Sequence, residues 1–140
     1  MIETYDVGSM PFIGDLEKFS EGAVKLISQP LGYYEGASDE AVKYFEMKIA
    51  ESFLDKLSAG IDIPNYPQFR DMTKMFLEKM EAGYFETGTL SLRNSRPDIP
   101  EVLAIRRNSR EIYERNGEPF RVKLCVTGPY TLSLYIFYIN

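Results

Sequence analysis

Apolar residues recur at helical spacing in four stretches of the chain and gather in three shorter, β-prone stretches between them. The predicted amphipathic helices cover residues 16–27, 38–57, 69–80 and 98–117. Ser38 is placed to cap the second helix, and Gly60 follows it as a natural stop. Asp98 and Glu101 have the spacing of a capping box at the start of the fourth. The helical pattern is therefore supported by end signals as well as by periodicity.

The three β-prone stretches cover residues 2–7, 61–64 and 121–127. Strands separated by helices of this length imply parallel pairing with crossover helices. No repeat, low-complexity tract or Pro/Gly linker divides the sequence. We therefore predict an α/β fold and one domain over residues 1–140. A self-contained nucleotide-binding domain is a weaker interpretation, because neither a GxGxxG turn nor a P-loop is present.

The residues that the chain lacks restrict its chemistry. It has no histidine, which removes the usual general base near neutral pH and the commonest nitrogen ligand for zinc. One cysteine, Cys125, cannot form an internal disulfide, and its place within an apolar stretch favours a buried, inert thiol. Catalytic triads and histidine-bound metal sites within this chain are therefore excluded.

The net charge and the apolar stretches of the sequence predict its compartment and its partners. A net charge of -5 argues against binding to nucleic acid or to anionic lipid. Residues 1–10 do not have the pattern of a secretory leader, and the apolar run 132–139 is far shorter than the ~20 residues of a membrane-spanning helix. We expect a cytoplasmic protein with no membrane partner.

In parallel α/β folds, ligands collect beyond the carboxyl ends of the strands. The turns at residues 8–11, 65–68 and 127–131 occupy those places. Together with the start of the third predicted helix they supply the candidate substrate-binding residues Gly8, Ser9, Tyr66, Gln68, Asp71, Gly128 and Thr131. For any one turn alone, Gly and Pro ending a strand is the simpler explanation, and Asp71 alone is better explained by helix capping.

Arginines gather on the fourth predicted helix at Arg106, Arg107 and Arg110. They could suggest a phosphate site. The same predicted helix carries Glu101, Glu111 and Glu114 at distances suited to surface ion pairs, however, and we interpret the cluster as a solvated face.

Three motifs occur in order along the chain. They are Val7-Gly8-Ser9-Met10-Pro11, the stretch 63–72 that reads Ile-Pro-Asn-Tyr-Pro-Gln-Phe-Arg-Asp-Met, and the stretch 122–132 that contains Cys-Val-Thr-Gly-Pro-Tyr-Thr. Together they resemble the superfamily of cobalamin-independent methionine synthase and uroporphyrinogen decarboxylase. That resemblance implies a partial (βα)8 TIM barrel, the first three or four βα units with parallel strands, because a complete barrel takes ~250 residues. It also implies that Ser9 contacts the amino-acid moiety of homocysteine.

The sequence departs from the family in two respects. Methionine synthases usually carry a Gly-Glu pair before the Asp-Met that resembles Asp71-Met72, whereas this chain has Asn65-Tyr66-Pro67-Gln68 there. The closer likeness is to a methionine synthase-like branch with an Ile-Pro-aromatic-Pro-Gln loop. The family's zinc ligands lie later in the barrel, and Cys125 matches none of them. Zinc is therefore implied for the intact family and no cofactor for this chain.

The expected function follows from the resemblance. Family members transfer methyl groups to thiols such as homocysteine, in methionine biosynthesis, or decarboxylate a porphyrinogen. We expect the N-terminal portion of a methionine synthase-like methyltransferase that meets a small thiol substrate or methyl donor, carries no catalytic residue and is inactive by itself. The alternative is a non-catalytic α/β binding or assembly module that forms homo-oligomers through open strand edges.

Overall fold

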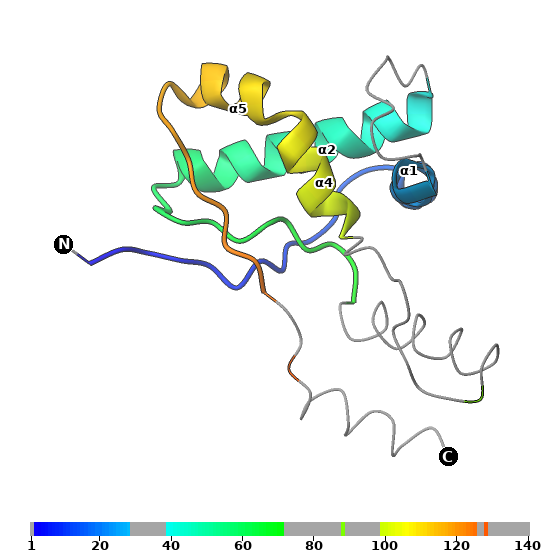
Figure 1. The fold of residues 1–140 in the computed structure, drawn as a ribbon, viewed down its shortest axis with the longest axis horizontal. Coiled ribbons are helices and arrows are strands. Elements are labelled where there is room, and N and C mark those ends of the chain that lie inside the picture. Colours follow the sequence, from blue (N-terminus) through cyan, green and yellow to red (C-terminus); the bar gives the residue numbers. More distant parts are fainter. Residues whose placement is uncertain (1, 29–38, 72–87, 89–98, 126–127, 129–140) are drawn as a thin grey trace.

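The computed structural model describes residues 2–28, 39–71, 88, 99–125 and 128. Its described helices are α1 (Leu16–Ser28), α2 (Glu40–Ser58), α4 (Pro100–Arg107) and α5 (Ser109–Asn116). Figure 1 shows three extended stretches, coloured blue, green and orange, that pass beneath α2, α4 and α5. We name them the first segment (residues 2–10), the middle segment (61–69) and the third segment (120–125). The molecule thus has a helical layer and an extended layer.

The predicted parallel sheet is wrong for the described residues. The extended layer contains only isolated parallel bridges, which pair Tyr5 with Ile63, Ser9 with Gln68, and Asn65 with Lys123. Among the described residues no pair of segments continues into a strand ladder, and helices dominate, so a partial (βα)8 barrel does not fit. The physical reason lies in the middle segment. Pro64 and Pro67 have no N–H to donate, and the Asn65 N–H bonds to the Asp6 side chain instead of a backbone carbonyl.

The first two predicted helices are confirmed. The Asp15 side chain accepts a hydrogen bond from the Lys18 N–H at the start of α1, over 2.9 Å. Asp39 caps α2, because its Oδ1 accepts from the backbone N–H groups of Ala41 and Val42. Ser38, the predicted cap, lies outside the described residues. Acidic residues in the first turn of both helices also favour their formation.

The predicted helix over 98–117 is divided in two. Asn108 leaves the helical conformation, and its side-chain Nδ2 donates to the Ala104 carbonyl over 2.9 Å, which ends α4 before α5 begins. The N-cap of α4 is Ile99, without a side-chain hydrogen bond, and Glu101 forms an ion pair instead of a capping box. Most of the predicted helix over 69–80 lies outside the described residues.

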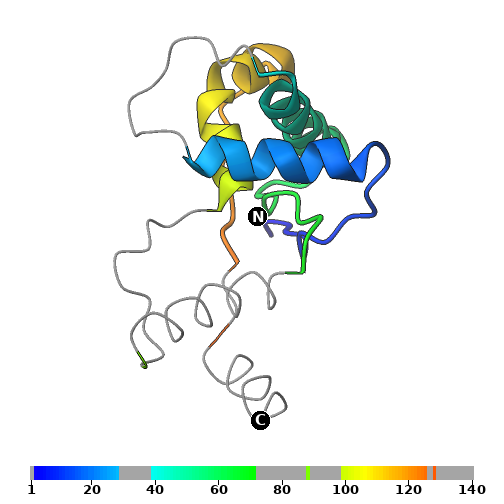
Figure 2. The ribbon, with the colours of Figure 1, turned by 90° about the vertical axis from the view of Figure 1, so that its right-hand side faces the viewer.

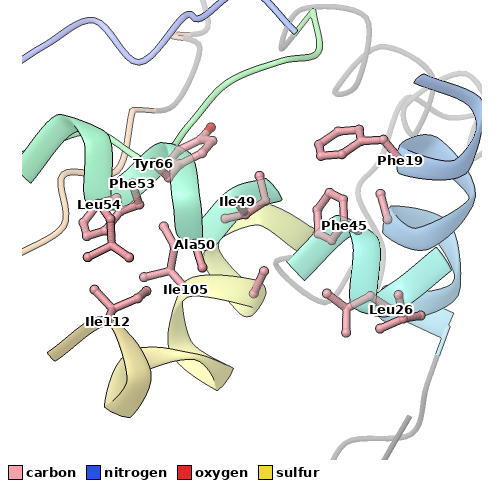
Figure 3. Close-up of a cluster of buried hydrophobic side chains, with 13 residues drawn as sticks. Phe19, Leu26, Phe45, Ile49, Ala50, Phe53, Leu54, Tyr66, Ile105 and Ile112 are labelled. Carbon is pink, nitrogen blue, oxygen red and sulfur yellow. The ribbon is translucent and has the colours of Figure 1, made fainter. Parts of the chain in front are cut away.

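A single apolar cluster joins the helices to each other and to the middle segment (Figure 3). Phe19 of α1 packs on Phe45 of α2 with ring centroids 4.7 Å apart. The two helices meet closely at Gly22, where an added Cβ would lie 2.1 Å from the Ala41 carbonyl oxygen. Figure 2 shows α1 running across α2 and α4. No helix of the described ranges is long and apolar enough to cross a membrane.

Candidate functional site

The first and middle segments bring two of the sequence motifs together. The Gln68 N–H donates to the Gly8 carbonyl over 2.9 Å, and the Met10 N–H donates to the Gln68 carbonyl over 3.2 Å. These bonds flank Ser9, whose own backbone N–H and C=O therefore point away from the middle segment. Ser9 is exposed, and Gln68 is half-buried. The predicted residues Gly8, Ser9 and Gln68 thus form one small site.

The register between these segments changes on the way to the site. Tyr5 pairs with Ile63, an offset of 63 − 5 = 58 positions, whereas Ser9 pairs with Gln68, an offset of 68 − 9 = 59. The middle segment therefore contains one more residue than the first between the two bridges. A one-residue excess of this kind is a bulge, which bends a segment and re-aims the side chains that follow it.

An ion pair lies at the bulge, with Lys56 buried and Asp6 partly buried. Lys56, at 5% side-chain exposure, projects from α2, and its Nζ lies 2.5 Å from the Asp6 Oδ2. The same ammonium donates to the Gly8 carbonyl over 3.2 Å and to the Asn65 carbonyl over 3.0 Å. An ammonium has three protons, so three acceptors satisfy it fully. Lys56 thus links α2 to both segments.

The Asp6 carboxylate uses both of its oxygens. Oδ1 accepts from the Asn65 N–H over 2.5 Å, and Oδ2 accepts from the Gly8 N–H over 3.0 Å in addition to Lys56. Burial by itself would raise the pKa of Asp6. The hydrogen bonds from Lys56 and from the two backbone amides, together with the Lys56 charge, outweigh burial and lower that pKa below its ordinary value.

Two side-chain amides close over the backbone of Gly8. Gly8 is buried with φ +88°, and an added Cβ would lie 2.7 Å from Asn65 Nδ2 and 2.8 Å from Gln68 Nε2. Asn65 Nδ2 donates to the Val7 carbonyl over 3.3 Å. Asn65 Oδ1 and Gln68 Nε2 are both buried and make no hydrogen bond with the described residues. Both atoms are enclosed by the protein around Gly8.

Tyr66 is buried against the apolar cluster, where Figure 3 shows it beside Phe53. Its hydroxyl donates to the Cys125 carbonyl over 3.3 Å. Burial, followed by the negative charge of Glu101, raises the pKa of Tyr66 to about 12. The Gln68 side chain opposes this rise. Tyr66 thus stays protonated near neutral pH, and its burial in the apolar cluster anchors the middle segment.

The remaining predicted site residues do not join this group in the described structure. Asp71 and Gly128 are exposed. Thr131 lies outside the described residues. Cys125 is half-buried with a free thiol, whereas the sequence predicted a buried one.

The arginine cluster divides between surface and interior. Arg110 pairs with Glu114 on the exposed side of α5, as predicted. Arg107 instead reaches across to Glu46 of α2 over 3.0 Å. Arg70, which directly follows the middle segment, donates two hydrogen bonds of 2.8 and 2.9 Å to the buried Glu101. This bidentate geometry fixes the end of the middle segment to α4.

Sequence reasoning missed Asp6 and Lys56, and it named Asn65 only as part of the turn at 65–68. One signal was present: Lys56 follows Ile49 and Phe53 at spacings of seven and three, which places a charge on the apolar face of α2. A charged residue on a buried helix face needs a partner inside the protein. Asp6 and Asn65 carried no comparable signal, because turn residues of these types occur in most loops.

Two polar side chains at the site are already engaged within the protein. Lys56 is saturated by its three acceptors, and Tyr66 stays protonated. In the described ranges no group of three or more His, Cys, Asp or Glu side chains is placed to hold a metal ion. The zinc implied for the intact family therefore stays a prediction. A separate depression of about 410 Å³ between α1 and α2 is open and lined by charges of both signs.

Comparisons with protein-family models, with curated proteins and with solved structures found no match to this chain.

Proposed function

We propose that this chain supplies part of the substrate-binding site of a methionine synthase-like methyltransferase, and that it binds without catalysing by itself. The substrate class is a small thiol such as homocysteine. The observation that carries the proposal is the Ser9–Gln68 bridge, which brings two motifs of the sequence resemblance side by side. The proposal rests on these motifs and on local geometry, and it does not depend on a barrel.

The chemistry of the site suits the polar end of an amino acid. Ser9 offers a hydroxyl and an outward backbone N–H, and Gln68 Nε2 is a donor that has no hydrogen-bond partner among the described residues. A carboxylate can accept from the hydroxyl and the backbone N–H of Ser9, whereas Gln68 Nε2 and Asn65 Oδ1 are enclosed by the protein. Among the described residues of the site, Lys56 is saturated by its three acceptors and Tyr66 stays protonated, which is why we propose binding alone.

The test is a ¹H–¹⁵N NMR titration of the chain with L-homocysteine under reducing conditions. We expect amide shifts centred on Ser9 and Gln68. The Ser9→Ala variant should bind about 5-fold more weakly, as expected for one hydrogen bond. Ser20→Ala, at an exposed position of α1, is the matched control and should bind like the wild type. Saturation without shifts at Ser9 and Gln68, or no response at millimolar ligand, would contradict the proposal.

The second candidate function is assembly into homo-oligomers. The observation that favours it is the exposure of large apolar side chains on the extended layer, with Ile2 at 92% and Val7 at 80%. Light scattering coupled to size exclusion, across a concentration series, tests it. Val7→Lys should reduce association, whereas Val24→Lys, at an exposed apolar position of α1, should not. A monomer at every concentration would exclude this candidate.

A further inference from the structure

We infer that Lys56 and Asp6 are positioning residues, which hold the one-residue offset that places Gln68 opposite Ser9. The inference deepens the proposed function and rests on it, because it explains how the proposed binding residues come to face each other. Neither residue is placed to touch a ligand in the described structure. Both act through the backbone of the first and middle segments.

The offset has a local cause in Pro67. Ile63 and Asn65 direct their N–H groups toward the first segment, the first to the Thr4 carbonyl and the second to the Asp6 side chain. The alternation of an extended chain would make residue 67 the next donor. Pro67 has no N–H. With a constant offset of 58, Ser9 would face Pro67, and the Gly8 carbonyl would receive no hydrogen bond from the backbone of the middle segment.

The ion pair supplies the contacts that make the offset of 59 specific. Asp6 takes the Asn65 N–H that would otherwise continue a regular ladder. Lys56 then binds the carbonyl of Gly8 in the first segment and the carbonyl of Asn65 in the middle segment. Gly8 is thereby held where the Gln68 N–H reaches its carbonyl over 2.9 Å. A slip back to 58 would break these contacts together.

Selecting the alignment of the first and middle segments is a reason to place this ion pair inside the protein. Buried ion pairs are weak sources of stability, because desolvation offsets their attraction, and their best-attested use is to select one register among several. The described interior of this small protein is otherwise mostly apolar. An apolar side chain at position 56 would continue the face formed by Ile49 and Phe53, but it would leave the offset unspecified.

The test is amide hydrogen exchange, measured by NMR, on the wild type and on the double variant Asp6→Asn/Lys56→Met. The double variant removes both charges and leaves no buried charge unpaired. The reporters are the Gln68 and Met10 N–H groups beyond the bulge. The internal controls are the N–H groups of Ile63 and Tyr66, whose acceptors are the Thr4 and Lys123 carbonyls.

We expect the reporters to exchange at least ~10-fold faster in the double variant, while the controls stay within about 2-fold. A purely structural role would move all four amides together, and that result, or no change at any of them, would overturn the inference. The variant Arg110→Met/Glu114→Gln, which removes an exposed pair in the same way, should leave all four unchanged.

A second variant keeps the test decisive if the double variant does not fold. Pro67→Ala restores an N–H at the position that the regular register would use. While Lys56 and Asp6 are present, we expect Gln68 and Met10 to keep their protection. Loss of that protection, with the position 67 amide protected instead, would show that Pro67 alone sets the offset and would overturn the inference.

The L-homocysteine titration then separates the two proposals. The double variant should lose the ligand-induced shifts at Ser9 and Gln68, if the wild type shows them. A wild type that does not respond would defeat the proposed function, whereas the exchange pattern, which needs no ligand, would still decide whether Lys56 and Asp6 set the register.

Discussion

The helical layer and the extended layer are stabilised by different kinds of contact. In the helical layer, apolar side chains such as Phe19, Phe45 and Ile49 are completely buried, and they recur at the spacing of a helix. In the extended layer, the contacts between segments are single bridges and side-chain hydrogen bonds, centred on Asp6 and Lys56. The helices are held together by burial of apolar area, whereas the three extended segments are joined to each other by a few directional bonds.

The difference explains where sensitivity to substitution should lie. Burial is spread over many atoms, so the helical layer loses free energy in proportion to the volume removed. Directional bonds depend on position within a few tenths of an ångström, so the extended layer should respond to small changes of shape or charge. The proposed binding residues belong to the second layer, where few contacts fix their geometry.

The largest loss should come from the helical core. Phe45→Ala removes an aromatic ring that packs on Phe19, and we expect it to lower the free energy of unfolding by about 3–5 kcal/mol. Met47→Ala, at an exposed position of the same helix, should change it by less than ~0.5 kcal/mol. Urea denaturation followed by circular dichroism measures both. Equal effects would mean that α1 and α2 do not share this core.

The next largest loss should come from the extended layer, at Gly8. Gly8→Ala puts an L-residue where the backbone is left-handed, and its Cβ would press against the Asn65 and Gln68 amides. We expect the free energy of unfolding to fall by about 2–3 kcal/mol. Gly60→Ala is the matched control, because φ is similar at +81° but the space around it is open, so about 1 kcal/mol should be lost. If the two variants lose the same free energy, the two amides do not close over Gly8.

A smaller effect depends on pH. The folded state lowers the pKa of Asp6 below its ordinary value of 3.8, so the ionised carboxylate stabilises the fold above that value. This contribution is lost as the pH falls through the folded pKa. Urea unfolding between about pH 2 and pH 7 should therefore show a decline at the acidic end. Asp6→Asn should flatten the curve, though only in part, because the pKa values of Asp39 and Asp62 are lowered too.

The smallest effect should be at the surface of the helical layer. Arg110→Ala removes an exposed pair with Glu114, and we expect a loss of no more than about 0.5 kcal/mol in the free energy of unfolding. The loss should fall further at high salt, because screening weakens exposed pairs. A loss above that size would mean that Arg110 makes further contacts in the fold.

The sequence was a good guide to the helical layer and a poor one to the extended layer. The apolar spacing in 16–27 and 38–57 predicted α1 and α2, because the contacts that bury those residues follow helix geometry. It did not predict the break at Asn108, which depends on one side-chain bond to Ala104. The β-prone stretches predicted strands, but strand pairing depends on which backbone groups meet, and Pro67 lacks the N–H that regular pairing would use.

The candidate site was predicted in part. Glycine and proline placed turns at Gly8-Ser9 and at Tyr66-Pro67-Gln68, and the structure brings these two turns together. The residues that hold them, Asp6 and Lys56, are 50 positions apart. Their contact is a property of the tertiary fold, and no spacing in the sequence encodes it.

One NMR measurement tests the alignment at the site most directly. Scalar coupling across hydrogen bonds links an amide nitrogen to the carbonyl carbon of its acceptor. We predict correlations from the Gln68 nitrogen to the Gly8 carbonyl and from the Met10 nitrogen to the Gln68 carbonyl. Their absence, in a spectrum where the Ile63 nitrogen correlates with the Thr4 carbonyl, would show that Gln68 does not face Ser9 and would contradict the account of the site.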